Sequence, residues 1–360
     1  MKTVLLPMVA LSLSLLGCPA ENAPVDDDDD DDVDVEGAAV RLGVKNFVNG
    51  ELTLLNDSAA TLQSFTASPD ANGWNVDDDA ASVITMKQQW KNARLSSERV
   101  QGVIAALFPA LDRATGGRWD GFIDEAADDN VFDDAGVTGV HGVERILFSD
   151  EVPADVLAFE QAHGDSFVPS RFTAPAFPAS LTQAEDFKGK LVQRLVDDTA
   201  TMKEEFLGVD LTLEAAFGAV LASLQAQAAK VNVAGAGQDE SRYAQHTLAD
   251  MRANLEGGLA IYEAFDALFD ARGDEGEALH DEIHEAFQRV RAHYDGITGD
   301  ALPLVPATWN PAQPSEADLA TEYGALFLFL TKETDVDDDT SFVSALQRGA
   351  ALLELTVPAE

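Results

Sequence analysis

The residues best suited to chemistry in this sequence are His141 and Glu144, within a Gly-Val-His-Gly-Val-Glu segment followed by an apolar run. On a helix, residues three positions apart lie on the same face, so the imidazole and the carboxylate point in one direction. Val140, Val143 and Leu147 share that side, and we therefore expect the pair to face a core or a cleft. Such a pair can supply two ligands to a divalent or ferric ion, which needs further ligands from other helices. The alternative is an ordinary surface pair or a core histidine with satisfied hydrogen bonds.

The elements that must position this pair are predicted to be helices, because apolar residues recur at intervals of three or four through most of the chain. Residues 151–178 contain four prolines and no clear period, and we expect a long connection there. Gly257 and Gly258 interrupt the clearest helical period and permit close approach of a neighbouring helix. Extended alternation of Val, Ile and Thr is absent from the sequence, so the predicted fold is all-α, built as bundles of antiparallel helices. The predicted helices cover 40–65, 80–111, 139–148, 181–206, 211–231, 248–269, 277–297, 316–331 and 341–355.

The charge balance argues against two classes of partner. The 360 residues include 64 acidic and 23 basic residues, for a formal net charge of -41. Nucleic acid and anionic lipid both require clustered Lys and Arg, so neither is an expected electrostatic partner. An acidic surface attracts cations without selecting one of them.

The first residues predict export and lipid anchoring. A basic start and an apolar run end at Leu-Leu-Gly-Cys18, which resembles the lipobox of bacterial lipoproteins. Cys18 is the only cysteine in the chain, and it lies where lipidation requires it. Residues 1–18 are therefore predicted to be a lipoprotein signal peptide, 19–39 a disordered aspartate-rich tether, and 40–360 the helical domain. The alternatives are an ordinary secretory signal and a calcium-binding aspartate tract, although the tract lacks the spacing of a calcium loop.

Four blocks of the chain resemble the imelysin-like family, which includes EfeO-like periplasmic iron-uptake lipoproteins. The block around His141 and Glu144 is similar to the family's G-x-H-x-x-E signature. The other blocks cover residues 240–257, 119–124 and 97–101. The resemblance implies a fold of two packed antiparallel four-helix bundles and a metal-linked role at the cell envelope.

The resemblance also implies a set of metal ligands. His141 and Glu144 match the signature pair, and Glu98, Asp124 and Glu240 match acidic positions proposed as ligands in relatives. Gln101 stands where relatives carry a further glutamate, and its amide brings no negative charge to the site. Carboxylates with one imidazole suit iron, copper or zinc.

The expected function is that of an envelope-anchored lipoprotein that binds a transition-metal ion, with iron first among the candidates, for uptake or handling. Its expected partners are the metal ion and a membrane iron permease or another uptake protein of the envelope. The alternatives are a metal-dependent peptidase of the imelysin type and a surface domain whose metal site has decayed.

Three other histidines are candidates for a functional role. His280 and His284 are spaced like the histidines of H-E-x-x-H, but Asp281 stands in the glutamate position, so we expect a solvated helix face. His246 is expected either to support the metal site from outside its ligand set or to pack between helices.

Overall fold

The computed structural model describes residues 30–66, 77, 79–116, 137–167 and 175–357. Within these ranges every regular element is a helix, which confirms the predicted all-α class. Cys18 and Asp124 lie outside the described residues. None of the described helices is long and apolar enough to cross a membrane.

The helices of the first half of the chain are α1 (Asp30–Phe65), α2 (Ala80–Leu107), α3 (Pro109–Gly116), α5 (Gly139–Leu147), α6 (Ala154–Phe167) and α7 (Leu181–Asp186). A π-helical segment, Phe187–Val192, joins α7 directly to α8 (Gln193–Leu207). The second half contains α9 (Leu213–Gly235), α10 (Thr247–Tyr262), a 3₁₀ turn at Glu263–Phe265, α11 (Asp266–Asp270), α12 (Gly273–Asp295), α13 (Glu316–Leu319), α14 (Glu322–Glu333) and α15 (Phe342–Leu352).

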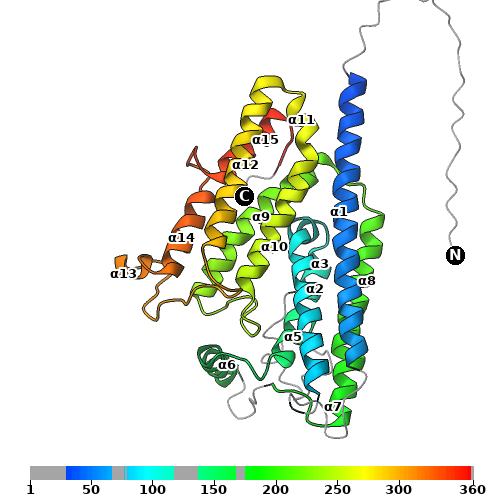
Figure 1. Cartoon of the computed structure of the whole chain (residues 1–360), viewed down its shortest axis with the longest axis vertical. Helices are drawn as coiled ribbons and strands as arrows, with labels where there is room; N and C mark the ends of the chain where they lie inside the picture. The colour runs from blue at the N-terminus through cyan, green and yellow to red at the C-terminus, as the bar shows by residue number, and fades with distance from the viewer. Residues whose placement is uncertain (1–29, 67–76, 78, 117–136, 168–174, 358–360) are drawn as a thin grey trace, which may run out of the picture.

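Helices α1, α2 and α8 run along the long axis of the molecule, and α1 is antiparallel to both of its neighbours (Figure 1). The buried face of α1 presents an apolar residue every three or four positions, which is the pattern of a helix packed on one side. Asn56 on α1 donates to the carbonyl oxygen of Val196 and the hydroxyl of Thr199 on α8, at 3.0 and 2.9 Å. The short helix α5 lies beside the lower half of α2 and packs against α2, α3 and the segment before α8 (Figure 1).

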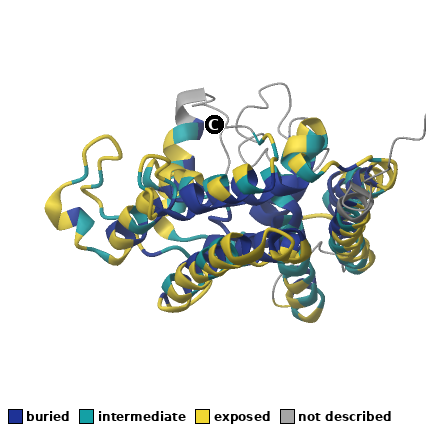
Figure 2. Ribbon diagram, turned by 90° about the horizontal axis from the view of Figure 1, so that it is seen from above, coloured by how far each residue is buried: buried dark blue, intermediate teal, exposed yellow. Residues whose placement is uncertain are grey.

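A second group of helices, α9, α10, α12, α14 and α15, packs around a core to which α1, α2 and α8 also contribute residues. Its interior is rich in aromatic side chains, and Phe217 contacts Tyr262 and Phe265 edge to face. Viewed from above, the buried residues face inward between the helices and the exposed residues face outward (Figure 2).

Helix α2 joins the two groups by packing closely on α9 and α10. A Cβ atom on Gly102 would overlap the carbonyl oxygen of Ala219, and one on Gly257 would overlap that of Arg99. The close helix approach expected at Gly257 is therefore confirmed.

Several elements differ from the sequence expectation. The helix expected over 80–111 ends at Leu107 and is followed by α3, and the helix expected over 248–269 is divided by the 3₁₀ turn between α10 and α11. Helix α1 begins at Asp30, so the last ten residues assigned to the tether are helical. Helix α6 lies within the proline-containing stretch expected to be a long connection, because Pro153 precedes the helix and the other three prolines follow it.

Candidate metal centre

Helix α5 carries His141 and Glu144 in the interior of the protein. All nine of its residues are buried, and the two side chains are 1% and 0% exposed. Gly139, at the first position, has φ +77°, and a Cβ atom there would press on the carbonyl group of Thr115. The helix can therefore pack this deeply only with glycine at its start. The burial expected for His141 and Glu144 is confirmed.

The carboxylate of Glu144 holds both the imidazole of His141 and a turn of the chain. One oxygen lies 2.7 Å from His141 Nδ1, and the other accepts the backbone N–H groups of Tyr243 and Ala244 at 2.9 and 2.8 Å. Both oxygens of Glu144 therefore have partners within the protein. A histidine that binds a metal commonly donates its second N–H to such a carboxylate, which fixes the ring and its tautomer.

The other ring nitrogen of His141 is directed at Glu240. His141 Nε2 is buried and has no hydrogen-bond partner in the described part of the chain. It lies 3.8 Å from Oε1 of Glu240, which is too long for a hydrogen bond. The side chain of Glu240 is 30% exposed, so the site reaches solvent on this side.

Two cations lie among the carboxylates of the site. Arg94 on α2 donates to Glu98, one turn further along the helix, and to Glu240 at 2.7 Å. Lys230 on α9 donates to Glu98 at 3.0 Å and also to Glu240. Glu98 is completely buried, and a buried carboxylate of this kind must be neutralised by such partners.

A further carboxylate, Asp250 on α10, completes the network. It accepts from Arg94 at 3.2 Å and from the hydroxyl of Ser241 at 2.5 Å, and it pairs with His246 Nδ1 at 3.0 Å. His246 immediately precedes α10 and contacts Trp90 edge to face, so it both pairs with Asp250 and packs between helices.

The pKa shifts reflect a site with more negative than positive groups. Burial and Arg94 lower the pKa of His141, but Glu144 and Glu240 outweigh them and leave that pKa above its ordinary value. Burial alone would raise the pKa of Glu240, but Lys230 and Arg94 hold it well below its usual range. For Glu98, burial prevails over the two cations and the pKa is raised.

The chemistry of these groups fits a metal ion at one position. Glu144 is fully engaged, and Arg94 and Lys230 hold both Glu98 and Glu240. Among the described residues of this site, the ligand atom without a partner is therefore His141 Nε2. The oxygen of Glu240 that faces it also accepts from Arg94, so an ion would share that oxygen with the guanidinium. The described part of this site contains fewer than three ligand atoms within 4.8 Å of one another. The remaining positions around such an ion would be taken by water or by groups outside the described residues.

The structure brings together four of the five residues that the resemblance implied as ligands, namely His141, Glu144, Glu98 and Glu240. Asp124, the fifth, and the lipidation candidate Cys18 lie outside the described residues.

Gln101 lies outside this group of four. It donates to Asp112 at 3.1 Å and so links the end of α2 to α3.

Three members of the network, Arg94, Lys230 and Asp250, are absent from the set predicted from sequence. A signal for Lys230 was present, because α9 contains only one other charged residue, Glu214, and a lone lysine on an apolar helix indicates a buried cation. Arg94 and Glu98 are four residues apart within the apolar stripe of α2, which indicates a buried ion pair. Asp250 stands in the same relation to His246.

A search of curated proteins finds no match. The model of the imelysin family (Peptidase_M75) matches residues 52–327, a span that covers more than half of the chain and includes α5, α9 and α10. The chain therefore belongs to the imelysin family.

Proposed function

We propose that this imelysin-family protein binds a transition-metal ion through His141 and Glu240, with iron as the first candidate and copper and zinc as alternatives. The observation that carries the proposal is the buried Nε2 atom of His141, which has no hydrogen-bond partner among the described residues and faces a carboxylate oxygen at 3.8 Å. A buried nitrogen left without a partner is costly, and a metal ion would satisfy it.

The charge of the site supports the same proposal. Four carboxylates, Glu98, Glu144, Glu240 and Asp250, surround two permanent cations, Arg94 and Lys230. With both imidazoles neutral, the site carries more negative than positive charge and attracts a further cation. Imidazole with carboxylate suits the borderline metals of the first transition row.

In the proposed role, the protein is attached to the cell envelope through a lipid on Cys18 and passes its ion to a membrane permease or another uptake protein. The support is the lipobox-like sequence and the family membership. A Cys18→Ser variant that still sediments with membranes would contradict the anchor.

The test is calorimetric titration of the purified protein with Fe²⁺ under anaerobic conditions, and with Cu²⁺ and Zn²⁺. We expect His141→Gln to abolish binding at this site. Glu144→Gln should weaken it by about 10–100-fold, because Glu144 orients the ligating ring. His293→Ala is the matched control, since His293 stacks on Phe329 and lies outside the network. Unchanged affinity in His141→Gln, with helical circular dichroism intact, would overturn the proposal.

A metal-dependent peptidase is the second candidate, and the name of the family model favours it. Hydrolysis would require a metal-bound water and a free general base. Against this, each carboxylate near His141 already has a cation or N–H partner among the described residues. We expect a peptide mixture to be unchanged after incubation with the metal-loaded protein, and cleavage that His141→Gln abolishes would favour the peptidase. A protein that binds none of the three metals would indicate a decayed site.

A further inference from the structure

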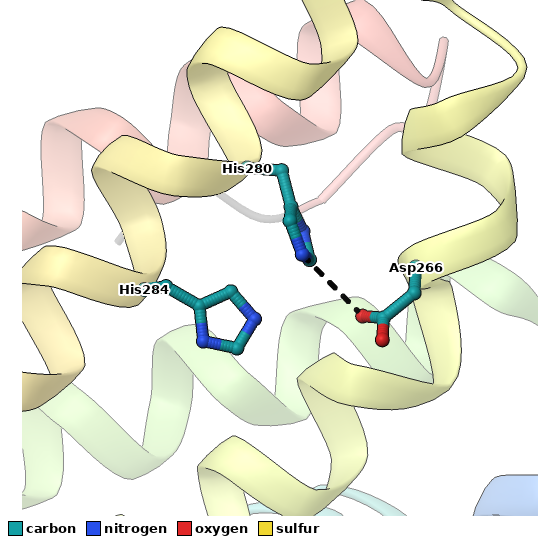
Figure 3. A group of neighbouring side chains, drawn as sticks. All are labelled: Asp266, His280 and His284. Carbon is teal, nitrogen blue, oxygen red and sulfur yellow. Dashed lines mark ion pairs between the residues drawn. The ribbon is translucent and has the colours of Figure 1, made fainter.

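A second group of metal-ligand side chains lies between α11 and α12, near the end of the molecule opposite α5 (Figure 1). It consists of Asp266, His280 and His284, and one ligand atom from each residue lies within 4.8 Å of the others. Figure 3 shows the carboxylate of Asp266 facing the ring of His280, with His284 beside them. Among the described residues, no other group of three His, Cys, Asp or Glu side chains comes this close.

The ring of His280 is held in one orientation by Tyr262. The Tyr262 hydroxyl lies 3.0 Å from His280 Nδ1, and the two rings stack with an interplanar angle of 21°. Nε2 is then the nitrogen directed at Asp266, at 3.8 Å from its carboxylate oxygen. In the tautomer that donates Nδ1–H to the phenol oxygen, Nε2 carries the free lone pair that a metal ion requires.

His284 lies one helical turn after His280 and on the same face of α12. The two rings have their centroids 4.4 Å apart. Within the described part of the chain, neither ring nitrogen of His284 has a hydrogen-bond partner that would compete with a metal. Two histidines four residues apart on a helix can bind the same ion.

The surroundings favour a cation and let it enter. The side chain of Asp266 is 52% exposed and that of His280 is 18% exposed, so the group opens to solvent while one wall is formed by protein. Burial raises the pKa of Tyr262, and the nearby carboxylates of Asp266 and Asp281 raise it further. The solvated face expected for His280 and His284 is thus partly covered.

We propose that Asp266, His280 and His284 form a second, surface metal site for one divalent ion of the zinc, copper and nickel class. Two imidazoles with one carboxylate match the ligand preference of these ions, and three protein ligands leave a position for water. The site shares no residue with the His141 centre, so it stands whether or not that centre binds metal.

The test is titration of the full chain with Zn²⁺ in the His141→Gln background, which removes the proposed first site. We expect one equivalent of Zn²⁺ to bind, and at least tenfold weaker binding when either His280→Gln or His284→Gln is added. His293→Gln, on the same helix, is the matched control and should leave binding unchanged.

A Tyr262→Phe variant and circular dichroism test the proposal further. Tyr262→Phe preserves the stacked ring but removes the hydroxyl that orients His280, and it should weaken Zn²⁺ binding by about 10–100-fold. Circular dichroism separates loss of ligands from loss of fold. Zn²⁺ binding that is absent from the His141→Gln background, or that survives the double change His280→Gln and His284→Gln, would overturn the proposal.

Discussion

The side chains of Glu144 and Glu240 act on His141 from opposite sides. One carboxylate oxygen of Glu144 pairs with Nδ1 of His141, and the other accepts the backbone N–H groups of Tyr243 and Ala244, which fix the side chain of Glu144. Glu240 faces Nε2 across 3.8 Å and is held in place by Arg94 and Lys230. The imidazole can therefore take either a proton or a metal ion at Nε2, and the two compete for the same lone pair.

This competition predicts a pH-dependent affinity for metal. Because the pKa of His141 is raised above its ordinary value, the ring is protonated over a wider pH range than a free histidine. Metal affinity should be full well above the raised pKa and should fall by about tenfold per pH unit as the pH drops through it. Titrations with Zn²⁺ between about pH 5 and 8 measure this slope, with His280→Gln and His284→Gln present so that the second proposed site does not contribute.

Nuclear magnetic resonance of the His141 ring in the metal-free protein gives the pKa independently. An affinity that stays constant through that pKa would show that His141 Nε2 does not bind the ion.

At the scale of elements, α2 is the helix on which the centre depends. It carries Arg94 and Glu98, and it packs against α1, α5, α9 and α10. The nitrogen of Trp90 donates to the carbonyl oxygen of Val140 at 2.8 Å, which ties α2 to the start of α5. Close packing at Gly257 brings α10, with Asp250 and Asn254, within hydrogen-bonding reach of α2.

The contact between α2 and α10 can be tested with a matched pair of glycine changes. Gly257→Ala should lower the free energy of unfolding by about 2 kcal/mol, because the new methyl group overlaps the carbonyl oxygen of Arg99 and forces the helices apart. Gly50→Ala, on the open face of α1, should instead raise it by about 0.5–1 kcal/mol, because alanine favours the helix and meets nothing within 4 Å.

Denaturant titration followed by circular dichroism measures both glycine variants. Equal effects at the two positions would contradict the packing described for Gly257.

At the scale of the whole molecule, the dominant property is negative charge. The formal net charge of -41 leaves the folded chain with strong internal repulsion at low ionic strength. It also raises the local concentration of cations around both proposed metal sites.

Added salt should therefore stabilise the fold. The screening length falls from about 30 Å at 0.01 M to about 8 Å at 0.15 M, so repulsion between distant carboxylates is largely removed over this range. We expect the melting temperature, measured by circular dichroism, to rise by a few degrees, and to rise equally in sodium and lithium chloride. A fall with added salt would show that attractive ion pairs outweigh the repulsion.

The sequence by itself determined the elements and the local geometry of the first centre. Apolar spacing identified most of the long helices, since burial of one helix face leaves a period of three to four residues. The same rule placed His141 and Glu144 on one buried face. The close helix contact at Gly257 was predicted from the lack of a side chain on glycine. The long connection predicted from the prolines of residues 151–178 was wrong in part, because those prolines flank α6 and do not interrupt it.

Only the tertiary structure decided which groups meet. Arg94 and Asp250 are 156 residues apart, and Lys230 and Glu98 are 132 apart, so no local spacing predicts that these cations neutralise the carboxylates. The tertiary fold also gave Glu144 its backbone partners, and it placed Asp266 beside the histidines of α12. Local spacing fixes which residues share a face of one helix, whereas the packing of several helices fixes which charges and ligands share a site.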